Sequence, residues 1–328
     1  MRRVARRFVC VLLLAFLVYS SASVWFVHHP RRWLESKESS WPRFAVSALL
    51  WLGNPLGDAV DAAGLMGDDA VVAAPGPPPS GAVTYAGYPR RIAAPAPSDI
   101  RVIERGDFAV GWSPSLGHPV WCAYHVPADA RFDPGKRPNF TKDKDAPGSP
   151  ASSAYSRTGY DRGHMVPNYA IATRFGSEAQ KSTFLMSNVS PQTPQLNRGV
   201  WREIEHRIAD LWAARWGEIW VVVGAVSSGS ETLSGTHVDV PTYFYQVVVA
   251  QSGGETRAFA VLFEQEVPWR AWPTRYIVSI DELEALTGLD FLPDMPGAAQ
   301  DALESKTPTR LWPVRLLDVL RIWWIHGL

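Results

Sequence analysis

The 328-residue sequence predicts a protein of the α+β class, built around one folded domain. Runs rich in valine and aromatic residues predict β strands at residues 108–112, 120–126, 219–226, 244–250 and 257–263. Residues 197–216 predict a helix instead, because apolar residues recur there at intervals of three and four. A shorter helix is expected at residues 281–287, where acidic residues stand early, as a helix N-terminus favours.

The chain opens with a segment that predicts membrane targeting. Four arginines precede residues 8–27, a run of twenty residues without charge that is long enough to span a bilayer as a helix. A cleaved signal peptide is the alternative, since residues 8–19 are apolar and Ser20–Ala22 form a candidate cleavage site. We therefore expect residues 1–30 to be a membrane anchor, which contacts the bilayer through residues 8–27, or a signal segment.

Two further segments flank the predicted domain, which spans residues 99–300. Residues 31–98 predict a juxtamembrane region and a linker, because residues 74–98 are rich in proline and alanine and resemble a semi-extended spacer. Residues 301–328 form an apolar tail with interior arginines. This tail could pack on the core, lie in the membrane interface or bind a partner.

Cysteine usage excludes two kinds of stabilisation. The cysteines are Cys10, inside the N-terminal apolar segment, and Cys122, in a predicted strand. No disulfide can therefore form within the predicted domain, and no Cys/His cluster supports a zinc site.

Two polar clusters carry the candidate chemistry. The first is Asp-Arg-Gly-His at residues 161–164, and the second comprises Ser187-Asn188, Pro191-Gln192, Leu196-Asn197, Trp201 and Glu205. A neutral histidine can accept a proton from water, and a neighbouring arginine disfavours its protonated form. An asparagine and a glutamate on one helix supply oxygen ligands for a hard cation. Together these groups suit the metal-assisted cleavage of a phosphodiester.

Both clusters resemble, intact and in order, the motifs of the DNA/RNA non-specific endonucleases of the ββα-metal type, the family that includes endonuclease G. The likeness extends to flanking segments and covers about residues 100–300. It implies a ββα-metal nuclease core, in which a central, mainly antiparallel sheet is flanked by helices, here with an added N-terminal hydrophobic segment. It also implies a sugar-non-specific endonuclease that hydrolyses DNA and RNA and leaves 5′-phosphate ends.

The resemblance assigns roles to particular residues. It implies that His164 is the catalytic general base, and that Arg162 and Arg137 contact the phosphates of the substrate. Asn188 is expected to hold the base, or the turn around it. Asp161 is expected to brace its loop rather than to touch substrate. Cations at positions 198, 202 and 207 could meet phosphates, although a solvated helix face is the commoner outcome.

The resemblance also implies a metal site. Asn197 would be a direct ligand, although a helix N-cap is the alternative role for an asparagine at this position. Glu205 follows eight residues later, about 80° around and about 12 Å along an ideal helix. We therefore expect Glu205 to reach the ion through a bound water. One amide ligand plus several waters suits Mg²⁺, with Mn²⁺ as the alternative ion.

Charge is unevenly distributed, although the formal net charge is zero. Residues 131–207 carry twelve Lys/Arg against seven Asp/Glu, whereas residues 208–300 carry four against twelve. A polyanion should therefore dock on the half that contains both motifs.

An exported nuclease is the leading hypothesis. The alternative is a nucleic-acid-binding or DNA-uptake protein on the same fold with little or no catalysis. A serine hydrolase is disfavoured, because the sequence lacks a Gly-x-Ser-x-Gly motif. We expect the catalytic domain to lie outside the cytoplasm, where it could not attack the cell's own genome. It would be membrane-anchored there, or secreted or periplasmic if the N-terminal segment is cleaved. A homodimer is left open.

Overall fold

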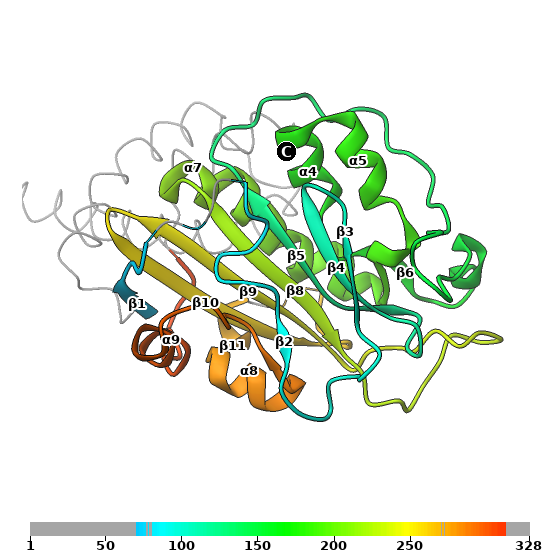
Figure 1. The fold of residues 1–328 in the computed structure, drawn as a ribbon. Helices are drawn as coiled ribbons and strands as arrows, with labels where there is room; N and C mark the ends of the chain where they lie inside the picture. Colours follow the sequence, from blue (N-terminus) through cyan, green and yellow to red (C-terminus); the bar gives the residue numbers. More distant parts are fainter. Residues whose placement is uncertain (1–69, 77, 79–80, 270, 272, 313–328) are drawn as a thin grey trace, which may run out of the picture. The chain divides into compact units, whose positions relative to one another are not determined.

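The computed structural model describes residues 70–312, apart from residues 77, 79–80, 270 and 272 (Figure 1). A compact unit spans Asp68–Leu311. Its centre is an antiparallel sheet with the strand order β1-β10-β9-β8-β5-β4-β3, in which β11 also pairs with β10. The predicted α+β class and antiparallel sheet are confirmed.

The strands of this sheet lie close to the predicted apolar runs. In chain order they are β1 (Ala70–Ala73), β3 (Arg101–Glu104), β4 (Phe108–Ser113), β5 (His118–Val126), β8 (Ile219–Val226), β9 (Tyr243–Ser252), β10 (Glu255–Glu264) and β11 (Ile277–Val278). Alternate residues of each strand point to opposite faces, so that both faces require cover.

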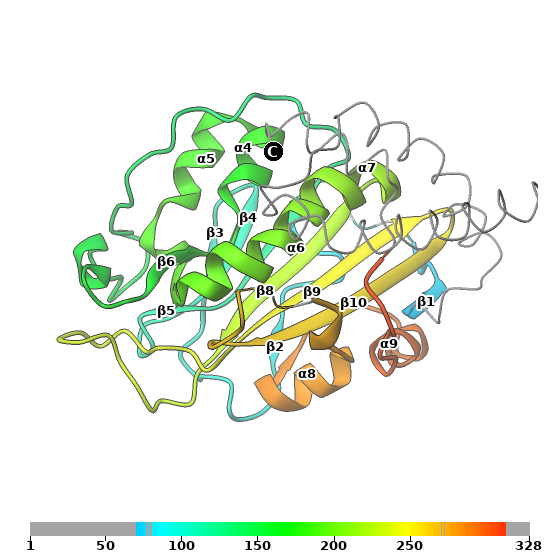
Figure 2. The ribbon, with the colours of Figure 1, turned by 180° about the vertical axis from the view of Figure 1, so that it is seen from behind.

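A long helical stretch covers one face, as the periodicity of residues 197–216 predicts (Figure 2). It is not uniform, because α turns at α6 (Arg202–His206) and α7 (Ala213–Trp216) alternate with wider π turns at η3 (Leu196–Trp201) and η4 (Arg207–Trp212). Its Trp201 ring lies 5.9 Å from Phe244 of β9, and its Trp212 ring lies 5.2 Å from Phe259 of β10. Tryptophans of the predicted apolar stripe therefore seat the helix on the sheet.

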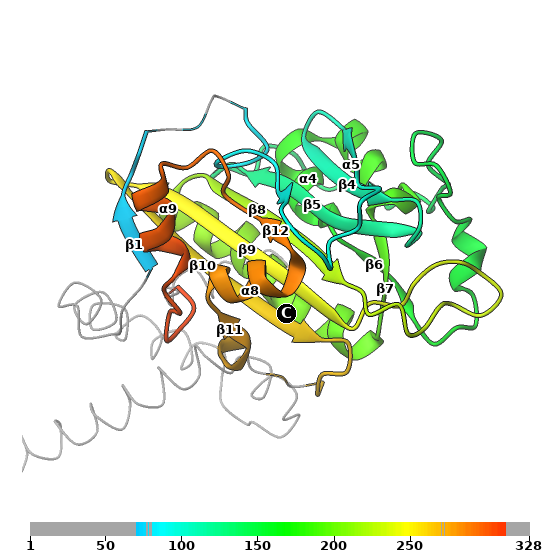
Figure 3. The same cartoon turned by 60° about the horizontal axis from the view of Figure 1, so that its bottom comes forward.

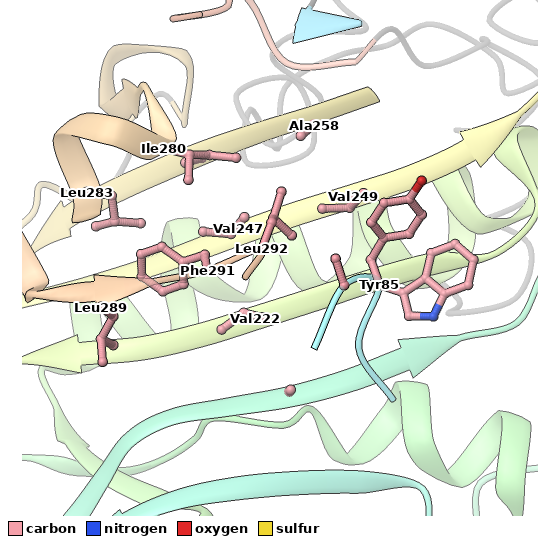
Figure 4. Packing of buried hydrophobic residues seen from close by; sticks show 14 of the residues in the cluster. Tyr85, Val222, Val247, Val249, Ala258, Ile280, Leu283, Leu289, Phe291 and Leu292 are labelled. Carbon is pink, nitrogen blue, oxygen red and sulfur yellow. The ribbon is translucent and has the colours of Figure 1, made fainter. Parts of the chain in front are cut away.

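The second face is covered by α8 (Ile280–Thr287) and α9 (Gly297–Glu304) (Figure 3). The helix expected at residues 281–287 is confirmed. It begins with a capping box, in which Glu282 N–H donates to the Ser279 hydroxyl and Ser279 N–H donates to the Glu282 carboxylate. Beneath it, Leu283 and the nearby Phe291 join the buried cluster that includes Val222 and Val247 of the sheet (Figure 4).

In the sequence, six further elements lie between β5 and the long helix. They are η1 (Ser152–Tyr155), β6 (Asp161–His164), α4 (Asn168–Phe175), α5 (Ser177–Thr183), η2 (Met186–Asn188) and β7 (Val189–Gln192). Elsewhere, β2 (Arg90–Arg91) pairs with β12 (Leu289–Asp290), and η5 (Pro273–Tyr276) precedes β11.

The structure corrects the predicted boundary between linker and domain. Residues 31–98 were expected to be a juxtamembrane region and linker, but β1 pairs with β10 along the edge of the sheet, and β2 pairs with β12. Tyr85 is buried and packs on Trp220, with ring centroids 5.4 Å apart. The short strand β1 occupies the free edge of β10, which would otherwise expose unpaired backbone groups. The folded domain therefore begins upstream of residue 99.

The predicted anchor or signal at residues 1–30 and most of the apolar tail lie outside the described residues. Within the part of the chain that the structure describes, no helix is long and apolar enough to cross a membrane.

The buried hydroxyl pair of Tyr85 and Thr256 tests this corrected boundary. The two oxygens are 2.6 Å apart, so Tyr85→Phe should lower the free energy of unfolding by about 1–3 kcal/mol by leaving Thr256 without its partner. Adding Thr256→Val should recover part of the loss, since neither polar group then remains. Denaturant unfolding measures both effects, and an unchanged midpoint in Tyr85→Phe would restore the linker interpretation.

Candidate active site

The two sequence motifs form a pair of antiparallel strands followed by a helix, and the segment that joins the two strands carries α4 and α5. Strand β6 pairs with β7 in antiparallel register, with Asp161 opposite Gln192 and His164 opposite Val189. The side chain of Gln192 packs against β6 at Gly163. A Cβ atom on Gly163 would lie 2.1 Å from Oε1 of Gln192, so this position requires a glycine. The chain then enters the long helix at Leu196, so this ββα unit brings both motifs together.

A cleft of about 590 Å³ opens where β6, α4 and the start of the long helix meet. Among the residues expected at the site, Arg137, Arg162, His164, Asn197 and Glu205 line this cleft, whereas Asn188 does not. The other lining residues are Phe140, Asp161, Pro167, Asn168, Tyr169, Ala170, Arg198, Arg202 and His206. Four arginines in one cleft make it a site for anions.

His164 is held in an environment that keeps it neutral. Its ring lies 4.9 Å from the ring of Phe140 and 4.8 Å from that of Phe184. Burial, together with the positive charge of Arg137, lowers the pKa of His164 to about 3. Its Nε2 atom is buried and has no hydrogen-bond partner among the described residues, and the residue lines the cleft.

The two predicted phosphate-binding arginines reach the cleft from different elements. Arg162 donates from Nε and Nη2 to the Ser152 carbonyl, at 2.9 and 2.7 Å, and these bonds fix its side chain and leave Nη1 for another acceptor. Arg137 is exposed on the loop that precedes Phe140, with its guanidinium carbon 5.7 Å from the Phe184 ring centre. The arginine that acts on the pKa of His164 is thus Arg137 and not the adjacent Arg162.

Asn197 is tied to the first motif. Its Nδ2 atom donates to Oδ2 of Asp161 at 3.0 Å, and the amide oxygen takes no part in this bond. Arg198 also binds the Asp161 carboxylate, with Nε at 2.7 Å. Burial would raise the pKa of Asp161, but the bonds from Arg198 and Asn197 outweigh it and lower the pKa. The N-cap alternative for Asn197 does not hold, since residues 194 and 195 are already helical and the helix therefore begins before Asn197.

Glu205 lies on the same helix, at the inner end of the cleft. Burial raises the pKa of Glu205 to about 8, against the opposing effects of the Trp201 indole and of Arg202 and Arg137. A carboxyl group in such surroundings gains from a nearby cation, because the cation compensates for the water that burial removes. The Asn197 amide oxygen and the Glu205 carboxylate therefore form an oxygen donor set that fits a hard divalent ion.

Asn188 is fully buried and acts on the turn that follows His164. Its Oδ1 accepts from Val166 N at 2.8 Å, and its Nδ2 donates to Val166 O at 3.0 Å and to Thr183 O at 2.9 Å. The side chain is buried and does not line the cleft, and its contacts support the expected role of holding the turn.

The cleft also contains residues to which the sequence assigned no role. His206 follows Arg202 by four residues on the same helix, and this spacing was the available signal. Asn168 and Tyr169 arrive on α4, for which no motif gave warning. Arg207 turns away and binds Glu203 at 2.6 Å.

A separate carboxylate group lies outside this cleft. Asp281, Glu284 and Glu304 place oxygens within 4.8 Å of one another on α8 and α9, which cover the other face of the sheet. Burial is the main cause that raises the pKa of Glu284 to about 7 and that of Glu304 to about 8. These groups therefore take no part in the site formed by the two motifs.

The family follows from comparison with known proteins. A family model described as DNA/RNA non-specific endonuclease matches residues 90–298, which is more than half of the chain, and the chain belongs to this family. It is thus a nucleic-acid hydrolase by family, and the match begins upstream of residue 99, in line with the place of β2 in the fold.

Individual relatives carry nuclease names. A nuclease of Nostoc sp. is 34% identical over 224 residues, which cover 63% of this chain and 79% of the relative. Mitochondrial nuclease EXOG of Mus musculus is 30% identical over 195 residues, 53% of this chain and 52% of its own. Mitochondrial endonuclease G of Homo sapiens is 28% identical over 158 residues, 43% and 51% respectively. The chain thus spans about half the length of these two mitochondrial proteins.

A solved structure has a similar fold. A chain in the crystal structure of the EndoG/EndoGI complex superposes with a TM-score of 0.55 at 21% identity, covering 63% of this chain and 91% of that one. At this identity, the likeness concerns the fold alone.

The lowered pKa of His164 predicts a loss of stability in acid. The unfolded chain binds a proton at this residue near pH 6.5, whereas the folded chain does so only near pH 3, so stability falls as the pH drops below about 6.5. Between pH 6.5 and 4.5 the wild type should lose about 2–3 kcal/mol more unfolding free energy than His164→Asn. Urea titrations in EDTA measure this difference.

The matched control for this pH series is His237→Gln, since His237 is exposed and lies outside the cleft. Its stability should fall in parallel with the wild type. If His164→Asn also ran parallel to the wild type, the neutral state of His164 would not depend on the fold.

Proposed function

We propose that this chain is a sugar-non-specific endonuclease that hydrolyses phosphodiester bonds of DNA and RNA, uses Mg²⁺ and leaves 5′-phosphate ends. The observation that carries the proposal is the cleft itself. It joins a neutral histidine, the oxygen donors Asn197 and Glu205, and arginines that match a polyanion. The nuclease relatives support the reaction class.

His164 is the proposed general base. Because burial and Arg137 hold its pKa far below neutrality, the imidazole is neutral at physiological pH, and Nδ1 is the proposed proton acceptor because Nε2 is buried. A water placed between this nitrogen and the phosphorus loses its proton to His164 and attacks in line. The low pKa limits the basicity of the isolated ring, and the approach of a phosphate, whose charge offsets that of Arg137, raises it.

Arg162 and Arg137 are proposed to bind the non-bridging phosphate oxygens. Arg162 is prearranged for this task by its bonds to Ser152, so little side-chain entropy is lost when substrate binds. Arg137 sits close enough to His164 to lower its pKa, and therefore close to the proposed reaction centre. Such contacts read the backbone and not the bases, which accounts for indifference to sequence.

The metal would be held by the amide oxygen of Asn197 directly and by Glu205 through water. Asp161 orients the amide by accepting from its Nδ2 atom. When bound, Mg²⁺, or Mn²⁺ in its place, supplies electrostatic stabilisation of the charge that develops on the phosphate and on the departing 3′ oxygen.

The location and the oligomeric state belong to the same proposal. Residues 8–27 would attach the protein to a membrane and place the domain outside the cytoplasm, or be removed as a signal. A homodimer is the oligomeric state proposed for testing.

Digestion decides between a nuclease and a binding protein that has lost catalysis. The wild type should convert supercoiled DNA to shorter fragments and should degrade RNA, and EDTA should abolish both reactions. Binding without cleavage at any divalent ion concentration would favour the nucleic-acid-binding or DNA-uptake alternative.

His164→Ala should reduce cleavage by a factor of about 10²–10⁴, the usual contribution of a general base. Binding of DNA should persist, because the arginines remain. Turnover of a plasmid substrate and gel-shift binding measure the two properties, with His237→Ala as the matched histidine control. Near-native turnover in His164→Ala contradicts the role assigned to His164.

Asn197→Ala should lose activity and regain part of it at high Mg²⁺. The half-saturating Mg²⁺ concentration should rise by at least about tenfold, as losses around metal sites do. The melting temperature should change little, since Asn197 does not cap the helix. A lost melting transition, or an unchanged Mg²⁺ requirement, contradicts ligation.

A further inference from the structure

Trp269 is an exposed tryptophan on a preformed turn. Its exposed fraction is 54%, and the other large aromatic side chain exposed in the described part of the chain is Phe132 at 50%. The turn is closed by a bond from Ala271 N to Pro268 O of 2.9 Å, which places Trp269 at its second position. Large aromatic side chains are usually buried, and an exposed one beside a candidate site is a candidate contact for a ligand.

The segment that carries this turn is fastened to the ββα unit by Gln265. The Gln265 Oε1 atom accepts from Thr193 N at 2.9 Å, and its backbone carbonyl accepts from Thr193 Oγ1 at 2.6 Å. Its Nε2 atom donates to the carbonyls of Pro191 and Pro241 at 2.9 and 3.1 Å. Gln265 is buried, so these bonds fix the segment to the link between β7 and the helix.

The turn lies beside the start of that helix. A Cβ atom on Gly199 would stand 3.7 Å from the carbonyl oxygen of Trp269. Gly199 has φ −97° and ψ −119°, outside the helical region, and it follows Asn197 and Arg198, which both line the cleft. The backbone of Trp269 therefore lies next to the helix turn that carries Asn197 and Arg198, just outside the residues that line the cleft.

Charge distinguishes this border from the opposite one. The hydroxyl of Tyr160, next to the cleft residue Asp161, donates to Oε1 of Glu231 at 3.2 Å. Glu266 belongs to the same segment as Trp269. The cleft arginines attract phosphates, whereas these two carboxylates do not, so a bound strand would place its phosphates on the arginines and could turn a base toward the indole.

We propose that Trp269 is a stacking platform for an unpaired nucleobase next to the bond that is cut, which makes single-stranded DNA and RNA the preferred substrates. Stacking on an aromatic face is open to every base, so it adds affinity without sequence preference. In a duplex the bases are stacked on one another and cannot reach the indole. This inference rests on the proposed nuclease function.

The test compares a single-stranded oligonucleotide with the same sequence as a duplex. Trp269→Ala should raise KM for the single strand by about 5- to 100-fold, the range expected for one stacked base, and leave kcat and duplex cleavage within about twofold. Trp269→Phe should restore most of the loss, because it keeps an aromatic face. The matched control is Phe132→Ala, whose side chain is 50% exposed on another loop and outside the cleft.

A binding measurement separates this inference from the proposed function. Fluorescence anisotropy of a labelled oligothymidylate in EDTA reports affinity without cleavage. A wild type that binds this oligonucleotide but does not cut nucleic acid with Mg²⁺ would contradict the proposed nuclease function, and the stacking role would still be measured by the loss of affinity in Trp269→Ala. Equal effects of Trp269→Ala on single strand and duplex, or no effect on either, would overturn the stacking role. So would a changed oligomeric state in Trp269→Ala without a change in oligonucleotide binding, since the indole would then serve a protein interface.

Discussion

The candidate site depends on the carboxylate of Asp161, which receives hydrogen bonds from Asn197 and Arg198. This carboxylate sits on the same strand as His164, three residues away, whereas Asn197 and Arg198 begin the helix. The interaction therefore sets the position of the proposed metal ligand relative to the proposed base. Because the bonds lower the pKa of Asp161, the carboxylate stays charged and the link holds over the physiological range.

Rigid attachment keeps this unit in place. Strands β6 and β7 form a separate two-stranded sheet, and contacts outside the large sheet join it to the fold. Asn188 holds the turn after His164 from the side of β5, and Gln265 holds the end of β7 from the side of β10. Reacting groups must be placed within fractions of an ångström, which buried hydrogen bonds provide better than solvated ones.

The cleft disfavours the charged forms of both His164 and Glu205. Burial lowers the pKa of His164 to about 3 and raises that of Glu205 to about 8. Both shifts have the same physical cause, the loss of water around a charge, and Arg137 acts on both. An anionic substrate and a cation together would compensate for these costs, so the cleft is arranged for their joint presence.

The sequence by itself determined the α+β class, the long helix, the helix at residues 281–287 and the identity of the cleft residues at the two motifs. These follow from local periodicity and from residue types at fixed spacing, which need no knowledge of contacts. Only the tertiary structure decided that Ala70–Ala73 closes the edge of the sheet, since proline-rich flanks hide a short strand whose partner lies far away in the sequence. It also placed Asn188 behind the cleft, made Arg137 the arginine that acts on His164, and brought Trp269 beside Gly199. Burial and charge proximity join residues distant in sequence, and such properties exist only once the chain has folded.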